Sequence, residues 1–210
     1  MLLPLLSRFS AQAVDPPTVG NSSAIFTALK QGGYVVVFRH GATNRNQADT
    51  DPLNPSNIGK QRLLSSQGKK QAQQIGTAWK KLGIPLEKVY TSKFQRAIET
   101  GQLISGRSVI SSIDITEGGL VVTPIENERR AKSLLKMAST PPAISTNTLI
   151  VTHKPNIIDA FGKDWFEVKE GEASVFKPDG SGQLRLIARI KAPEWIAAAA
   201  QWNIYWFFSR

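Results

Sequence analysis

The 210-residue chain contains no cysteine, and only two of its residues are histidine. Disulfides, thiolate metal sites and cysteine nucleophiles are therefore excluded. Its 26 Lys and Arg residues form no long block of like charge, so a basic tail of the kind that binds nucleic acid is not indicated. No stretch approaches the length of about 20 apolar residues that crosses a bilayer, so an integral membrane segment is not expected.

The composition indicates one folded domain. Hydrophobic residues make up 41% of the chain, enough for a real core. The formal net charge of +10 suits anionic partners, namely nucleic acid, an acidic membrane surface or phosphorylated substrates. Because the cations come singly and in pairs, the same charge also fits an ordinary solvated surface. The oligomeric state is not indicated.

Residues 1–22 resemble a leader and linker, and residues 23–210 are expected to form a single domain. The leader is apolar over residues 1–6, and Ala11-Gln12-Ala13 has the small-x-small form of a signal-peptidase site. This pattern predicts a periplasmic or secreted protein. The basic residues that normally precede the apolar run are missing, so a cytoplasmic protein with an uncleaved leader is the alternative.

Strands and helices are expected to alternate. Apolar β-branched runs and turn residues predict strands at 34–38, 88–91, 108–113 and 148–152, followed by a hairpin of 173–176 and 184–190. Helical spacing and capping residues predict helices at 24–31, 95–104 and 126–137. A further helix is expected to begin at a cap, Ser65 or Ser66, and to end at Gly83. This order predicts a three-layer α/β/α sandwich with a mainly parallel central sheet. The polar segment 41–63 is too long for a simple connection and indicates a functional loop.

Both histidines follow buried strands directly. His40 comes after the first predicted strand and His153 after the strand at 148–152, and functional groups gather at the carboxyl ends of strands in open α/β sheets. Arg39 precedes the first histidine, and Arg96 opens the helix after another strand. The planar donor fork of an arginine at such a junction suits a phosphate group, although a surface salt bridge is the simpler alternative. Gly41 allows the backbone to approach a ligand closely.

Several segments, in order, resemble the histidine phosphatase superfamily, the phosphoglycerate mutase-like proteins. The first is Arg39-His40-Gly41-Ala42-Thr43 with Asn46. The others are the helix start at 64–72, the segment Ser92 to Thr100 containing Arg96, the strand ending at His153, and the hairpin near 171–180. The resemblance covers roughly residues 33 to 195 and is nearest to a compact phosphatase branch that includes bacterial envelope phosphatases.

The resemblance implies a role for each matched residue. His40 is expected to be the nucleophile that forms a phosphohistidine, and Arg39, Arg96 and His153 to form the cationic pocket around the transferring phosphoryl group. Phosphate binding is expected to include Gly41, Thr43 and Asn46. No metal and no other cofactor is implied, because arginine supplies the positive charge.

The general acid departs from the family pattern. Relatives often carry a glutamate in an "L-x-E" setting, and Leu120-Val121-Val122 places valine there. Glu126 is the first choice because it opens a helix, although its charge also complements a helix dipole. The alternatives left open are Glu128, Glu117, Asp49 and Asp51.

The expected function is hydrolysis of a small phosphorylated metabolite, sugar or envelope component by a metal-independent histidine phosphatase. Mutase activity is disfavoured by the compact chain. The alternatives are a regulatory phosphohistidine protein phosphatase and a phosphate-binding protein without catalysis on the same fold. The combination of two histidines and two arginines argues against a nucleic-acid binder.

Overall fold

The computed structural model describes residues 22–208, with side chains described from residue 24 to residue 201. Residues 1–21 of the leader and linker predicted for residues 1–22 therefore lie outside the described residues. The helices are α1 (Ser22–Gln31), α2 (Ser66–Lys81), α3 (Gln95–Ser105), α4 (Pro124–Ala138), α5 (Lys154–Phe161) and α6 (Ala192–Phe208). The strands are β1 (Val35–Arg39), β2 (Leu86–Ser92), β3 (Ile110–Ser112), β4 (Asn147–Thr152), β5 (Ala173–Pro178) and β6 (Leu184–Ile190).

The described strands form one mixed sheet in the order β3-β2-β4-β1-β5-β6. β1 pairs in parallel with β4, β4 with β2, and β2 with β3. The predicted hairpin of β5 and β6 is antiparallel and joins the sheet beside β1. Because β1 and β4 are adjacent and parallel, their carboxyl ends bring the two histidine-bearing segments together.

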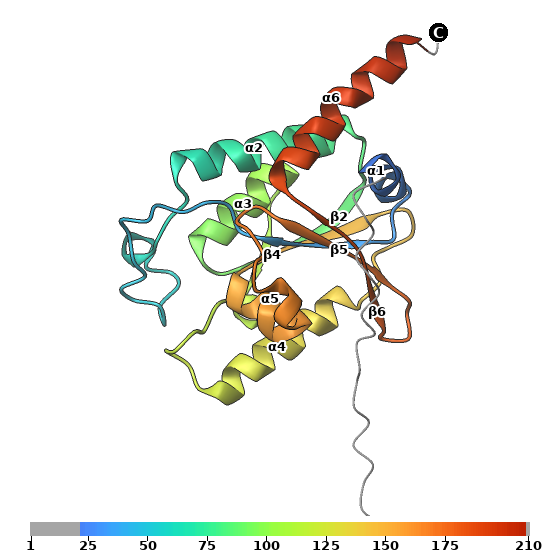
Figure 1. Cartoon of the computed structure of the whole chain (residues 1–210). Coiled ribbons are helices and arrows are strands. Elements are labelled where there is room, and N and C mark those ends of the chain that lie inside the picture. The colour runs from blue at the N-terminus through green and yellow to red at the C-terminus, as the bar shows by residue number, and fades with distance from the viewer. Residues whose placement is uncertain (1–21, 209–210) are drawn as a thin grey trace, which may run out of the picture.

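Helices cover both faces of the sheet, which confirms the three-layer α/β/α sandwich (Figure 1). Successive side chains of a strand point to opposite faces. Val36 and Phe38 accordingly pack in one core with α1, α2, α3 and α6, whereas Val35 and Val37 pack in a second core with α4 and α5. All four side chains are at most 1% exposed. The wholly apolar strand thus supplies both cores and fixes the position of the residues that follow it.

The structure differs from the sequence expectation at several boundaries. α4 begins at Pro124, not at 126, because the Thr123 hydroxyl accepts the backbone N–H of Glu126 and caps the helix. α5 and α6 were not predicted. Among the described helices, none is long and apolar enough to cross a membrane.

Candidate active site

His40 follows the last residue of β1 and is 2% exposed. Its backbone N–H donates to the carbonyl of Thr152 at the end of β4, which ties the two strand ends together. The Nδ1 atom lies 2.8 Å from the carbonyl oxygen of Gly41. A carbonyl oxygen only accepts, so we assign the imidazole proton to Nδ1. The Nε2 atom then carries the free lone pair and can act as a nucleophile.

The surroundings of His40 keep the imidazole neutral. Burial, followed by the positive charge of Arg96, lowers its pKa to about 3. Arg39 and Arg62 act in the same direction, so three cationic side chains influence one neutral ring. An uncharged imidazole is the form that can attack phosphorus.

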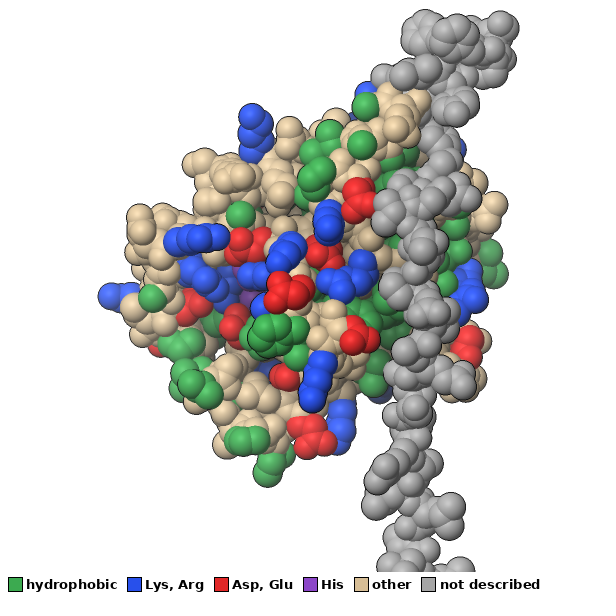
Figure 2. Space-filling view, in the orientation of Figure 1, with side chains coloured by type: hydrophobic (Ala, Val, Ile, Leu, Met, Phe, Trp, Pro, Cys, Tyr) green, Lys and Arg blue, Asp and Glu red, His purple; other side chains and the backbone are tan. Residues whose placement is uncertain are grey.

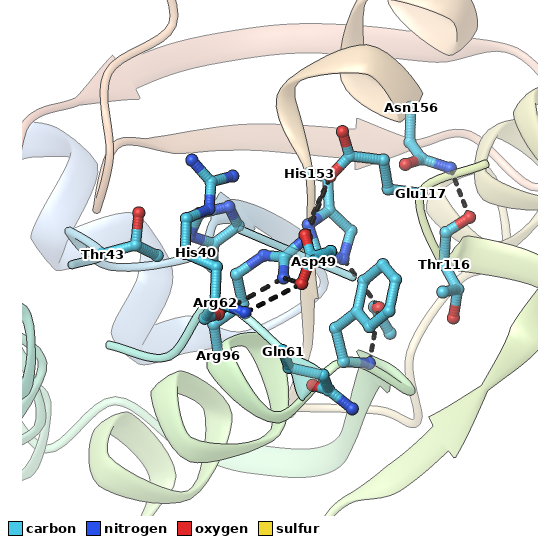
Figure 3. Close-up of polar contacts among 12 residues, drawn as sticks. His40, Thr43, Asp49, Gln61, Arg62, Arg96, Thr116, Glu117, His153 and Asn156 are labelled. Carbon is cyan, nitrogen blue, oxygen red and sulfur yellow. Dashed lines mark hydrogen bonds and ion pairs between the residues drawn. The ribbon is translucent and has the colours of Figure 1, made fainter. Parts of the chain in front are cut away.

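Arg96 lies at the start of α3 and its side chain is fully buried. One terminal nitrogen donates to Oδ1 of Asp49 at 3.0 Å, and the other donates to Oε2 of Glu117 at 3.1 Å. The guanidinium carbon lies 4.4 Å from the centre of the Phe94 ring. Two carboxylates and one aromatic ring thus hold this cation in a fixed orientation (Figure 3).

His153 is fully buried, and its ring centre lies 5.1 Å from that of His40. Its Nε2 atom is hydrogen-bonded to the Ser92 hydroxyl at 2.7 Å. Its Nδ1 atom lies 3.3 Å from Glu117 Oε2 but makes no hydrogen bond within the described structure. Burial and the charge of Arg96 lower the pKa of His153 well below its ordinary value. This ring is therefore also neutral, and one of its nitrogens faces the site.

Arg39 is held from the opposite side of the site by the segment before β5. Its Nη1 atom donates to the carbonyl of Val168 at 2.8 Å, and Nη2 lies 3.5 Å from a carboxylate oxygen of Glu170. The same oxygen accepts a long hydrogen bond, 3.4 Å, from the hydroxyl of buried Thr43. Arg39 and Thr43 thus share one carboxylate oxygen of Glu170 as a partner.

Three buried nitrogens of the site have no hydrogen-bond partner among the described residues: Nε of Arg39, Nε of Arg96 and Nδ1 of His153. Buried donors are normally paired, by protein or by a bound group. Two of them belong to arginines whose positive charges lower the pKa of His40, and the third belongs to the neutral ring of His153. Their arrangement suits a tetrahedral oxyanion that fills the space beside the nucleophile.

The loop 41–63 contributes a residue that the sequence analysis missed, Arg62. Its backbone N–H donates to Oδ1 of Asp49 at 2.9 Å, and its carbonyl oxygen accepts from Arg96 at 3.4 Å. The buried side chain of Gln61 accepts the backbone N–H of Gln95 at the start of α3. An arginine within a polar loop carries no distinctive sequence pattern, and only these contacts bring it to the site.

Glu117 is the candidate acid that the structure places beside both Arg96 and His153. The expected glutamate setting was assigned to the wrong segment, because Leu120 is fully exposed whereas Ile115 is fully buried. Ile115-Thr116-Glu117 fits the same pattern with isoleucine in place of leucine.

Three of the other candidate acids, Glu126, Glu128 and Asp51, pair with residues outside the site. Glu126 is bound by Arg129 and Arg130, whose hydrogen bonds lower its pKa to about 2. Glu128 pairs with Lys132 on the surface of α4, and Asp51 accepts from Asn57 within its own loop. Asp49 accepts hydrogen bonds from the Arg96 guanidinium and from the backbone N–H of Arg62.

Two predicted phosphate-binding residues lie less directly in the site. The backbone N–H of Gly41 donates to the Thr100 hydroxyl at 3.0 Å, and its carbonyl oxygen holds His40. A Cβ atom at Gly41 would lie 3.2 Å from the carbonyl oxygen of Gly68, which accounts for glycine here. Asn46 is exposed in the turn after Thr43, where its backbone N–H donates to Asn44. Its role in binding stays a prediction.

The family model described as histidine phosphatase superfamily (branch 1) matches residues 35–119, which confirms the resemblance. No curated protein sequence matches the chain significantly. Among solved structures, the protein histidine phosphatase SixA complexed with tungstate is 17% identical with a TM-score of 0.55, over 76% of this chain and 97% of that one. The phosphoserine phosphatase of Entamoeba histolytica in complex with 3-phosphoglyceric acid is 16% identical with a TM-score of 0.52, over 77% and 98%. A putative alpha-ribazole-5'-P phosphatase from Escherichia coli is 17% identical with a TM-score of 0.51, over 75% and 95%. These likenesses show the fold.

Proposed function

We propose that the chain is a phosphoric monoester hydrolase that acts without a metal. The proposal starts from its fold and from the segment that matches the histidine phosphatase superfamily. The observation that carries the proposal is the orientation of His40. Its Nδ1–H donates to Gly41, which leaves the Nε2 lone pair free to attack phosphorus, and Arg39, Arg96 and His153 each keep one buried nitrogen without a hydrogen-bond partner among the described residues.

The reaction has two steps. In the first, His40 Nε2 attacks phosphorus, the bond from phosphorus to the leaving oxygen breaks, and Glu117 gives its proton to that oxygen. In the second, a water molecule attacks phosphorus, the bond from phosphorus to His40 Nε2 breaks, and the protons of the water leave with the inorganic phosphate, while Glu117 regains its proton from solvent. Arg39 and Arg96 stabilise the charge on the other phosphoryl oxygens in both steps.

Glu117 is a better choice for the acid than Glu126. A general acid must carry a proton before the bond breaks. The two arginines that bind Glu126 lower its pKa to about 2 and so oppose that form. Glu117 also pairs with an arginine, Arg96, but it lies beside His153, whose ring centre is 5.1 Å from that of His40, and so it is close to the reacting group.

A small phosphorylated metabolite, sugar or envelope component is the proposed substrate. Lys and Arg side chains gather across the middle of the face shown in Figure 2, between scattered acidic ones. With the net charge of +10, this surface attracts anionic molecules at long range. A screen of phosphorylated sugars, nucleotides and peptides would identify the preferred class.

Two variants test the mechanism. His40→Ala should abolish turnover, and wild type quenched during reaction should carry an acid-labile, base-stable phosphate on His40. Glu117→Gln should slow hydrolysis of a sugar phosphate by about 10²-fold or more and spare nitrophenyl phosphate, whose leaving group needs no proton. Glu128→Gln is the matched control, because Glu128 is exposed and pairs only with Lys132. Normal turnover by His40→Ala would refute the proposal.

Export to the periplasm or secretion is proposed from the leader alone. If Ala11-Gln12-Ala13 is a processing site, protein recovered from its native envelope should begin at Val14. An intact Met1 on cytoplasmic protein would contradict export.

A further inference from the structure

Thr116, the residue before Glu117, forms hydrogen bonds through both its hydroxyl group and its carbonyl oxygen. Its carbonyl oxygen accepts from Arg130 Nη1 at 3.0 Å and from Asn156 Nδ2 at 3.3 Å. Its hydroxyl donates to the carbonyl of Ser112 and accepts the backbone N–H of Lys93. Thr116 is 1% exposed. Because these bonds fix the Thr116–Glu117 peptide, they also fix the point from which the Glu117 side chain extends.

Arg130 is the donor that links this peptide to α4. It is 7% exposed, and its Nε atom donates to Oε1 of Glu126 at 2.8 Å. A Cβ atom built on Gly118 would lie 3.4 Å from Arg130 Nη1, so the same guanidinium lies against the residues on both sides of Glu117. One carboxylate thus orients a buried cation whose other contact is the backbone beside the proposed acid.

We propose that Arg130, oriented by Glu126, is a positioning residue for the general acid Glu117. The inference rests on the proposed function of Glu117. Without the Arg130 donor, the buried Thr116 carbonyl keeps only the longer bond from Asn156, and the peptide gains freedom to move. Misplacement of a reacting group by about 1 Å costs about 10²-fold in rate. The effect falls on the leaving group, since Arg130 has no contact with His40 or Arg96 in the described structure.

Arg129 provides a matched control. It also donates to both oxygens of Glu126, at 2.7 and 2.8 Å, and it pairs with Asp114. It makes no contact with Thr116, and its side chain is 46% exposed. Arg129→Met and Arg130→Met remove the same charge from adjacent positions and weaken the same carboxylate pairing. Only the second removes a bond to the backbone beside Glu117.

The experiment compares both variants with wild type on a sugar phosphate and on nitrophenyl phosphate, in the full chain. Arg130→Met should lower kcat on the sugar phosphate by about tenfold, a fraction of the 10²–10⁴-fold that a general acid contributes. Its KM, its activity on nitrophenyl phosphate and its inhibition by inorganic phosphate should stay within about twofold of wild type. Arg129→Met should leave both substrates within about twofold. If Arg130→Met does not fold, Arg130→Lys, which keeps the charge but has one nitrogen in place of the two that bind Glu126 and Thr116, should show the same preference to a smaller degree.

Glu117→Gln distinguishes the two ways in which the proposal could fail. If Glu117→Gln slows both substrates equally, the proposed acid is wrong and this inference is overturned with it. If Glu117→Gln acts only on the sugar phosphate but Arg130→Met acts on both or on neither, the acid stands and the positioning role of Arg130 is refuted. Equal effects of Arg129→Met and Arg130→Met would also refute it.

Discussion

Acid should destabilise the protein through the same burial that keeps His40 nucleophilic. The pKa of His40 is about 3 in the folded protein, against an ordinary value of 6.5. The unfolded chain therefore binds more protons between these values, and stability that is complete above pH 6.5 is lost as the pH falls toward 3. At about pH 4.5 the loss from this one group is about 3 kcal/mol.

His40→Asn isolates this contribution, because asparagine does not titrate and its amide can still donate to the Gly41 carbonyl. The free energy of unfolding is measured by urea titration near pH 7.5 and near pH 4.5, in buffers without phosphate. Wild type should lose about 3 kcal/mol more than the variant. The buried His153 changes stability in the same direction in both proteins, so the difference reports His40. Equal losses would refute the assignment of a buried neutral imidazole.

Two further predictions concern charge at the phosphoryl end of the site. Asp49→Asn should lower kcat/KM about tenfold on sugar and nitrophenyl phosphates alike, because one oxygen of Asp49 holds both the Arg96 guanidinium and the Arg62 backbone. Asn57→Ala, which loosens the same loop without touching either arginine, should retain activity. A loss confined to the sugar phosphate would contradict this role of Asp49. Activity should survive EDTA, because arginines supply the charge and the described residues contain no group of three or more His, Asp or Glu that could hold a metal; loss on chelation that added Mg²⁺ or Zn²⁺ restores would show the opposite.

Sequence patterns predicted the parts of the fold that local physics determines. The runs at 34–38 and 148–152 consist of apolar and β-branched residues, and both lie in buried central strands that a histidine follows directly. α5 was missed because it has only eight residues and opens on Lys154-Pro155. α6 was missed because its apolar residues show no helical face, being rich in alanine from 197 to 200.

The site residues divide in the same way. Arg39, His40 and His153 end or directly follow a strand, and Arg96 opens a helix, so their convergence could be anticipated. Arg62 and Glu117 come to the site only through contacts between distant segments, with Asp49, Arg96 and His153. Glu126 was preferred as the acid from its helix position, but Arg129 and Arg130 follow it at three and four residues on the same helix, a spacing that favours the ion pairs observed.

The Thr100 hydroxyl donates to the carbonyl of Arg96 and accepts the N–H of Gly41. The Thr100 hydroxyl oxygen therefore holds the segment that carries His40 and the start of the helix that carries Arg96 in one fixed position relative to each other. Libraries that vary position 100 freely, while leaving 41 and 96 unchanged, should yield few active clones. Clones that replace the exposed residues of the 41–63 loop keep both hydrogen bonds of the Thr100 hydroxyl. The loop is therefore the safer starting point for redesigning substrate selectivity.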